Sequence, residues 1–302
     1  MKDRQRNKRF RKERTLQMRR RTRIQRETAA EVTRLLKEAE QKIKATLAGA
    51  PTEFEAWYLP QLQQSIRQAL AEMGNQAAAR LSARAGEAWQ AGLDLVDRPL
   101  AASGIDIAAL LPEVDTAQLQ AMRTFMTDRM RDVGVKLADR INTELGLVAI
   151  GAQDQGKAIA NIAGMIEKGG RSRAITIIRT ELGRAYSTAS HARQVQASEY
   201  LPGLKKQWRR SGKVHSRFHH DAADGQIREI GKPFTLYAKT GPVELMYPRD
   251  PKAPPAETIN CGCESLPYME SWDMANPGKK PFSDLELQSR MKKELAASQS
   301  LL

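Results

Sequence analysis

The chain has few cysteines, few aromatic residues and no long apolar segment. Two of its 302 residues are cysteine, and aromatic residues make up 5%. Two cysteines cannot form the disulfide framework of a small secreted domain, so a reducing compartment is expected. No stretch approaches the roughly 18 uninterrupted apolar residues of a membrane span, and the charged N-terminus lacks the apolar core of a secretory signal. The sequence therefore predicts no membrane partner.

Basic residues are plentiful, but they are concentrated at the N-terminus. The formal net charge is +14, and residues 1–26 hold 13 Lys or Arg against Asp3 and Glu13. Such a segment can bind double-stranded DNA without sequence preference, because released counterions supply the affinity. A solvated tail is the alternative. We predict a basic tail over residues 1–28, with phosphate contacts from Arg4, Arg6, Lys8, Arg9, Arg11, Lys12, Arg14, Arg19, Arg20, Arg21, Arg23 and Arg26.

Apolar residues follow a helical period from about residue 27 to residue 200. Residues 27–99 predict three helices, separated near Gly49-Ala50-Pro51 and before residue 77, with a kink or break at Pro60 and an end at Pro99. Further helices are expected over 154–170, ended by a glycine pair, and over 172–200.

A long helix is expected over 115–150, begun by Asp115 or Thr116 as a cap. Its methionines could form an adaptable binding groove, but methionines on an apolar stripe more often belong to a core. The stripe consists of Leu119, Met122, Met126, Met130, Val133, Leu137, Ile141 and Leu145.

The composition changes at Pro202-Gly203, where helical runs give way to short β-prone pieces. Asp224-Gly225 is a hairpin-type turn pair. Near the C-terminus, Ser283 and Glu286 have capping-box spacing at the start of a last helix. The expected fold is α+β: long helices in the N-terminal two thirds, a small β-rich unit packed on a helix, and a helical C-terminal tail. The expected divisions are 1–28, 29–165, 166–272 and 273–302.

Both cysteines and three of the four histidines lie within the β-rich segment. Cys261 and Cys263 are one glycine apart, a separation at which a disulfide would be strained. Two sulfurs with one or two histidines provide the soft tetrahedral shell that zinc prefers, although C-x2–4-C is the usual spacing. The alternative is a pair of small side chains that fills a turn.

Several separated motifs in this half of the chain resemble the phage Mu F-like minor head proteins, also called phage head morphogenesis proteins. The motifs read IIRTELGRAYSTASHARQ, KKQWRRSGKVHSRFHHDAADGQ, GKPF and LMYPRDPKAPPAETINCGC. The resemblance covers roughly residues 160–270. Two positions depart from the family pattern: Ala223 replaces a larger aliphatic residue, and Gly262 replaces an arginine. The matching residues are Arg179, Thr180, Glu181, Trp208, Arg217, His220, Asp224, Gly225, Gln226, Tyr247, Pro248, Asp250, Pro251, Asn260, Cys261 and Cys263.

The resemblance implies a minor capsid protein of a tailed phage, assembled in the host cytoplasm and placed in the capsid interior near the portal. Implied partners are the portal protein and a major capsid or scaffold protein, with contact to the packaged DNA. We predict no catalytic residues. If a metal is present, His220, Cys261 and Cys263 are three ligands of a zinc ion, and His215 or His219 is the fourth.

The alternative function is a metal-dependent hydrolase or nuclease delivered with the phage genome. His219, His220, Asp221 and Asp224 can be drawn as a metal-assisted site. Against it, the sequence holds no G-x-x-x-x-G-K-[ST] phosphate loop and no G-x-S-x-G nucleophile elbow.

Overall fold

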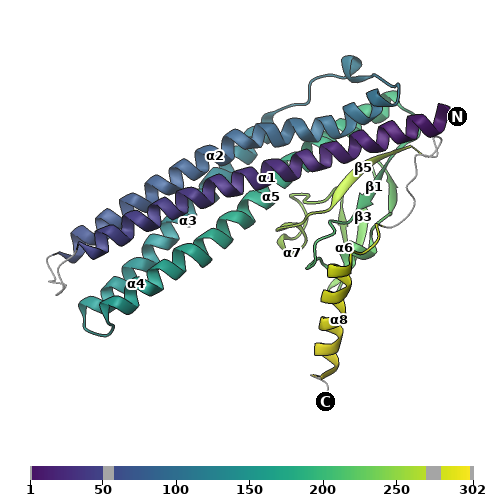
Figure 1. The fold of residues 1–302 in the computed structure, drawn as a ribbon. Helices are drawn as coiled ribbons and strands as arrows, with labels where there is room; N and C mark the ends of the chain where they lie inside the picture. Colours follow the sequence, from purple (N-terminus) through teal and green to yellow (C-terminus); the bar gives the residue numbers. More distant parts are fainter. Residues whose placement is uncertain (1, 50–57, 270–279, 300–302) are drawn as a thin grey trace. The chain divides into compact units, whose positions relative to one another are not determined.

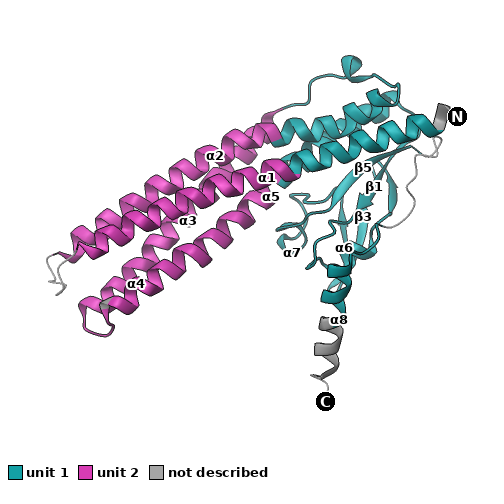
Figure 2. Cartoon of the chain, viewed as in Figure 1, with its two compact units in different colours: residues 1–21, 88–115, 183–302 teal, residues 22–87, 116–182 magenta. Residues whose placement is uncertain are grey.

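The computed structural model describes the chain except for residues 1, 50–57, 270–279 and 300–302. It is an α+β protein in which long helices precede a small set of antiparallel strands and a last helix (Figure 1). The chain divides into two compact units (Figure 2). The first unit comprises residues 1–21, 88–115 and 183–302, and the second comprises residues 22–87 and 116–182.

The predicted basic tail is instead the beginning of one long helix, α1 (Lys2–Ala48). Within the first unit, Phe10 is fully buried and belongs to a core cluster with Leu204 and Met269. From Phe10 onward one face of the helix is buried, and its positions recur every three or four residues, as a helix packed on one side requires. The buried residues between positions 10 and 28 are Phe10, Arg14, Gln17, Arg21, Ile24 and Thr28.

Residues 59–102 form a second long helix, α2 (Leu59–Ala102), so the break predicted before residue 77 does not occur. Pro60 does not kink the helix, because it lies in the first turn, where its missing N–H has no helical partner to lose. Pro99 does not end the helix either and lies inside it. Residues 50 and 51, where the sequence predicts a break between helices, lie outside the described residues.

Helix α3 (Ala117–Ala149) confirms the predicted stripe, whose residues are buried except for the partly exposed Met122. Gly134 lies where α3 approaches α2, and a Cβ there would be 2.4 Å from the carbonyl oxygen of Leu70. Helix α4 (Gln155–Gly164) begins at Asp154, whose carboxylate accepts from the N–H of Lys157. The glycine pair 169–170 does not end this helix. The chain continues through a π-helical segment, Met165–Gly170, into α5 (Arg171–Tyr200).

The β-rich region belongs to the first unit and contains two small antiparallel sheets. The β-prone pieces of the sequence, KKQWRRS, PFTLYA, VELMYP and CESLPY, each contain a strand, and one further short strand, β2, was not predicted. The Asp224-Gly225 turn joins helix α6 to β2 and is not a hairpin between two strands. The sheets have the orders β2-β1-β5 and β3-β4, with strands β1 (Leu204–Arg209), β2 (Ile227–Glu229), β3 (Phe234–Ala238), β4 (Gly241–Leu245) and β5 (Glu264–Met269).

The last helix, α8 (Asp284–Gln299), is attached to the β-rich region through buried charges. Arg210 Nη1 lies 2.5 Å from Glu286 Oε1, and the same Arg210 donates to the carbonyl oxygens of Lys280 and Pro281. Glu286 also accepts from the backbone N–H of Ser283, which is one half of the predicted capping box.

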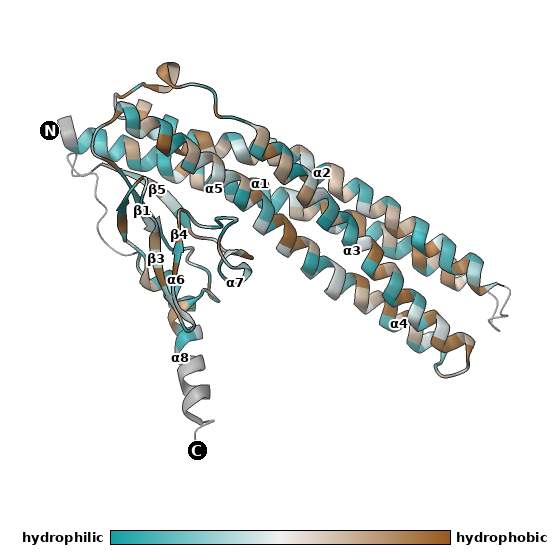
Figure 3. Cartoon of the chain, turned by 180° about the vertical axis from the view of Figure 1, so that it is seen from behind, coloured by the Kyte–Doolittle hydropathy of each residue, from teal (hydrophilic) through white to brown (hydrophobic). Residues whose placement is uncertain are grey.

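Hydrophilic and hydrophobic residues alternate in bands along the long helices (Figure 3). Among the described helices, none combines the length and the apolar character needed to cross a bilayer.

Candidate functional site

The strand β1 and the short helix α6 (Phe218–Ala222) fix the position of His220. Trp208 of β1 donates its indole N–H to the carbonyl oxygen of His220 at 3.0 Å, and the two rings meet edge to face. Phe234 packs edge to face on the same indole. Both Trp208 and His220 are buried, so the histidine ring is held from its backbone and from one face.

The two cysteines lie where the chain returns from the proline-rich segment. The short helix α7 (Pro255–Thr258) ends just before Asn260, which adopts a left-handed backbone with φ of 55°. Lys213 holds this turn by donating to the carbonyl oxygen of Asn260 at 2.6 Å and to its side-chain oxygen at 3.1 Å. The turn directs both cysteine side chains into the core cluster that contains Trp208.

Gly262, between the cysteines, stands where the resembling family has an arginine. A Cβ at this position would lie 2.8 Å from the Cβ of Ser211 and 3.0 Å from the Cε of Lys213. The segment that holds Asn260 therefore packs too closely on residues 211–213 for a side chain at position 262.

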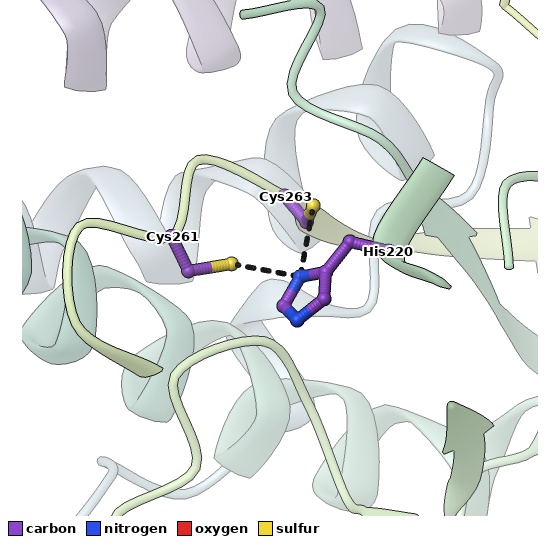
Figure 4. A group of neighbouring side chains, drawn as sticks. All are labelled: His220, Cys261 and Cys263. Carbon is purple, nitrogen blue, oxygen red and sulfur yellow. Dashed lines mark hydrogen bonds between the residues drawn. The ribbon is translucent and has the colours of Figure 1, made fainter. Parts of the chain in front are cut away.

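His220 and both cysteines come together in the folded chain (Figure 4). The Nδ1 atom of His220 is 3.6 Å from the Sγ of Cys261 and 3.7 Å from the Sγ of Cys263. All three side chains are buried, and their donor atoms lie within 4.8 Å of one another. The sulfurs converge on a single ring nitrogen, which is the arrangement that a shared ligand or proton requires.

The other ring nitrogen of His220 contacts a carboxylate. Its Nε2 is 2.7 Å from Oε2 of Glu257, and the Nε2 of His219 is also 2.7 Å from that oxygen. Glu257 is buried on α7 and was not singled out in the sequence, where it lies 37 residues from His220. The sequence signal that could have identified Glu257 is its position only a few residues before the two cysteines.

Neither histidine expected as a fourth ligand joins the sulfurs. His219 contacts Glu257 on the far side of the His220 ring from the cysteines. The Nδ1 of His215 lies 3.4 Å from the hydroxyl of Ser289 on α8. Among the residues that the structure describes, no further Cys, His, Asp or Glu belongs to the His220–Cys261–Cys263 group.

The pKa values of the two thiols are shifted in opposite directions. The hydrogen bond from Cys263 lowers the pKa of Cys261 well below its usual value, with help from His220 and Arg249. The same hydrogen bond, together with burial, raises the pKa of Cys263 well above its usual value. Burial acts to lower the pKa of His220, but the hydrogen bond and charge of Cys261 and the hydrogen bond to Glu257 raise it above the usual value. Within the pair of thiols, the negative charge is therefore favoured on Cys261.

A buried arginine that the sequence did not point to supports the cysteine segment. Arg249 is fully buried and has a left-handed φ of 69°. Its guanidinium donates to the carbonyl oxygen of Cys261 at 2.8 Å, to the hydroxyl of Ser187 at 2.5 Å and to Glu264 at 3.4 Å. The charge of Glu264 is also paired with Arg21 of α1. One network therefore connects α1, α5, β5 and the cysteine turn within the first unit.

The other family-pattern residues have structural contacts. In the first unit, Asp224 is buried and accepts from the backbone N–H of Arg210, and Gly225, with φ of 87°, donates to the carbonyl oxygen of Trp208. Arg217 donates to the carbonyl oxygen of Ile259 at 2.8 Å.

Three family-pattern residues, Arg179, Thr180 and Glu181, lie in the second unit. Glu181 is buried and is 3.2 Å from the guanidinium of Arg129. Arg179 has an exposed side chain, and its carbonyl oxygen accepts from Gln25.

The basic residues of α1 divide between its two faces. Arg14 and Arg21 are buried, which makes these two unavailable as the predicted phosphate contacts, since a helix turns every third or fourth residue towards the core. Burial, followed by the charges of Arg209 and Arg11, lowers the pKa of Arg14 to about 10. Arg6 and Arg20 are partly exposed, and Arg20 pairs with Asp94. The exposed ones are Arg4, Lys8, Arg9, Arg11, Lys12 and Arg19 in the first unit, and Arg23 and Arg26 in the second.

Residues 145–266 match the family described as "Phage Mu protein F like protein". This segment belongs to the phage Mu protein F-like family. The matched stretch includes α5, the Trp208 strand, the α6 turn and both cysteines, so the family unit contains the whole His220 cluster. The match supports a phage head protein, a component of the virion.

Two curated proteins are similar to parts of this chain. "Uncharacterized protein YqbB" of Bacillus subtilis (strain 168) is 35% identical over 104 residues, which cover 33% of this chain and 32% of YqbB. "NAD(+)--arginine ADP-ribosyltransferase EFV" of Enterococcus faecalis (strain ATCC 700802 / V583) is 26% identical over 119 residues, 38% of this chain and 23% of EFV. The similar segment is about a third of the length of YqbB and about a quarter of the length of EFV. No solved structure matches the chain significantly.

Proposed function

We propose that this chain is a minor capsid protein of a tailed phage that acts in head assembly at the portal, inside the capsid. The family match over residues 145–266 carries this proposal. The matched segment is held by buried contacts around Trp208, Asp224 and Arg249, which suits a rigid module that docks on other head proteins. The portal protein is the proposed partner, together with a major capsid or scaffold protein.

Contact with packaged DNA is a further part of the proposal, and the exposed face of α1 supports it. In the first unit, the exposed basic residues run from Arg4 to Arg19, about 22 Å along a helix at 1.5 Å per residue. Their face is opposite to the one that contains Phe10 and Arg14. A rigid row of cations can meet several phosphates of one duplex at once without reading its bases.

The proposed role is positional rather than catalytic. The name of EFV describes an enzyme, but only 23% of EFV is similar to this chain. Here the side chains that could activate water or a nucleophile are tied to one another: both histidines of α6 contact Glu257, and both cysteines are buried against His220. These contacts support a structural role for the four side chains.

Head incorporation tests the proposal. Mass spectrometry of purified virions should find the chain at low copy number beside the portal, and cross-linking of proheads should join it to the portal protein. Virions opened to release DNA then distinguish a capsid-bound protein from one that leaves with the genome. Absence of the chain from virions and proheads alike would overturn the proposal.

An activity assay addresses the enzymatic alternative. Pure protein should neither hydrolyse DNA, peptide or glycan nor transfer ADP-ribose from NAD⁺. Any such activity that is lost in His219→Ala, and retained in the variant His215→Ala, would replace the positional role with a catalytic one.

A further inference from the structure

We propose that His220, Cys261 and Cys263 bind a zinc ion through Nδ1 and the two sulfurs, and that Glu257 orients the histidine. The distances carry this proposal. A tetrahedral zinc with Zn–S of about 2.3 Å and Zn–N of about 2.0–2.1 Å places nitrogen and sulfur about 3.6 Å apart. The observed separations between Nδ1 and the two sulfurs are 3.6 and 3.7 Å.

Glu257 gives the histidine the correct tautomer for this role. A carboxylate only accepts hydrogen bonds, so the Nε2 atom that lies 2.7 Å from Glu257 must carry a hydrogen. In a neutral imidazole the Nδ1 atom is then unprotonated, and its lone pair points towards both sulfurs. Histidines that bind metals usually donate their second ring N–H to a carboxylate or carbonyl in this way.

The surroundings of the three side chains also suit a zinc ion, through burial, charge balance and contacts that fix the cysteines. The three donor side chains are buried, and two thiolates neutralise the charge of one zinc ion. Arg249 fixes the carbonyl oxygen of Cys261, and the backbone N–H of Ser211 bonds to the sulfur of Cys263. The ion would join α6 to the segment before β5, a cross-link that a reducing compartment allows and that a strained Cys-x-Cys disulfide would not provide.

The geometry also specifies which of the described residues can bind the ion. His219 and His215 are directed elsewhere, and within the described ranges no other Cys, His, Asp or Glu joins the three donors. The described part of the chain would supply two sulfurs and one imidazole nitrogen to the ion. The proposal concerns the stability of the folded segment and is independent of where the chain sits in the phage head.

Metal content of the full chain is the first test. Protein that has been reduced, loaded with excess zinc and desalted should retain about one zinc per chain, as measured by elemental analysis. Cys261→Ser and Cys263→Ser should lose it, whereas the matched control His215→Ala should keep it. X-ray absorption should report two sulfur neighbours and at least one nitrogen.

The two thiols give a second readout, since the chain has no other cysteines. Zinc should slow their reaction with a thiol reagent in the wild-type protein, and a chelator should restore it. Glu257→Gln should bind zinc about 10- to 100-fold more weakly, as expected when an outer-shell partner is weakened, and still bind one equivalent at saturation.

Three outcomes would overturn the proposal. One is folded, reduced wild-type protein that retains neither zinc nor cobalt, which would leave a hydrogen-bonded cluster of imidazole and thiols. A second is zinc retention by the double variant Cys261→Ser/Cys263→Ser equal to that of the wild type. If the cysteine variants do not fold, a cobalt-loaded wild-type protein without a sulfur-to-metal charge-transfer band would overturn it equally.

Discussion

The β-rich region of the first unit and the helices of the second unit use charged side chains in opposite ways. Around the cysteine turn, Arg249 is fully buried and donates to three different segments of the chain. In the second unit, Arg84 has three partners as well, all of them carboxylates, but its side chain is 26% exposed. The number of partners is similar, and burial differs. The comparison indicates that the stability lost with a charged side chain depends on whether its former partners can hydrogen-bond to water instead.

Replacement of Arg249 should have the largest effect. Arg249→Ala leaves Glu264 and the carbonyl oxygen of Cys261 buried with fewer donors, so we expect the free energy of unfolding to fall by about 3–5 kcal/mol. Chemical denaturation of the reduced protein measures this change. Lys252→Ala, at an exposed position three residues further on, should remain within about 0.5 kcal/mol of wild type. If Arg249→Ala lowers the free energy of unfolding by less than about 1 kcal/mol, the buried Arg249 and the exposed Arg84 do not differ in the way proposed.

Lys206 should make stability depend on pH. Burial lowers its pKa to about 8 from the ordinary 10.5, while its Nζ donates to the carbonyl oxygen of Met246 at 2.7 Å. Between these two pH values the unfolded chain holds a proton that the folded chain has released. The free energy of unfolding should therefore rise between pH 8 and 10.5, by up to about 3 kcal/mol.

Denaturation at several pH values checks this dependence. Lys206→Met should abolish the rise, whereas the exposed Lys232→Met should keep it. Identical profiles for the wild type and Lys206→Met from pH 8 to 9.5 would show that the buried amine titrates normally.

The helices could be predicted where their buried positions are apolar, and not where those positions are polar. The stripe of α3 follows the helical period with apolar residues, and the structure confirms it. In α1, the buried face includes Arg14, Gln17 and Arg21, so the sequence predicted a basic tail and not a helix packed along one face. Their burial depends on packing against elements far along the chain, to which local periodicity is not sensitive.

The candidate site divides in a similar way. The proximity of His220 to the cysteines was predictable, because ligand-capable residues crowd one short segment and the family resemblance aligns them. Glu257 and Arg249 were not predicted, since an isolated charged residue in a proline-rich stretch gives no periodic signal. Their roles arise from tertiary contacts that bring α7 beside α6 and the guanidinium beneath the cysteine turn.

The exposed basic face of α1 should act through salt-sensitive binding and not through stability. We expect the triple variant Lys8→Gln/Arg11→Gln/Lys12→Gln to fold normally and to bind duplex DNA more weakly. If all three contact phosphates, the slope of log Kd against log salt should fall by about 2.7, at about 0.9 per contact. Fluorescence anisotropy at several salt concentrations measures this slope.

A matched control removes the same charge elsewhere. Lys232→Gln/Lys239→Gln/Lys252→Gln changes three exposed lysines of the β-rich region. It should leave the slope near the wild-type value. Equal slopes for the two triple variants would mean that net charge, and not the face of α1, determines DNA affinity.

Replacement of Arg84 should have the smallest effect, although its contacts look extensive. Arg84 lies 2.6 Å from Glu31 and 3.0 Å from Glu87, and hydrogen bonds with these two residues raise its pKa. All of these carboxylates are partly exposed, so water replaces the lost donor when the arginine is removed. We expect Arg84→Ala to cost about 0.5–1 kcal/mol, and less in high salt, because exposed ion pairs are screened. Denaturation at low and high salt measures both effects. A cost equal to that of Arg249→Ala, with no salt dependence, would show that the helical unit relies on its surface ion pairs as much as the cysteine turn relies on its buried arginine.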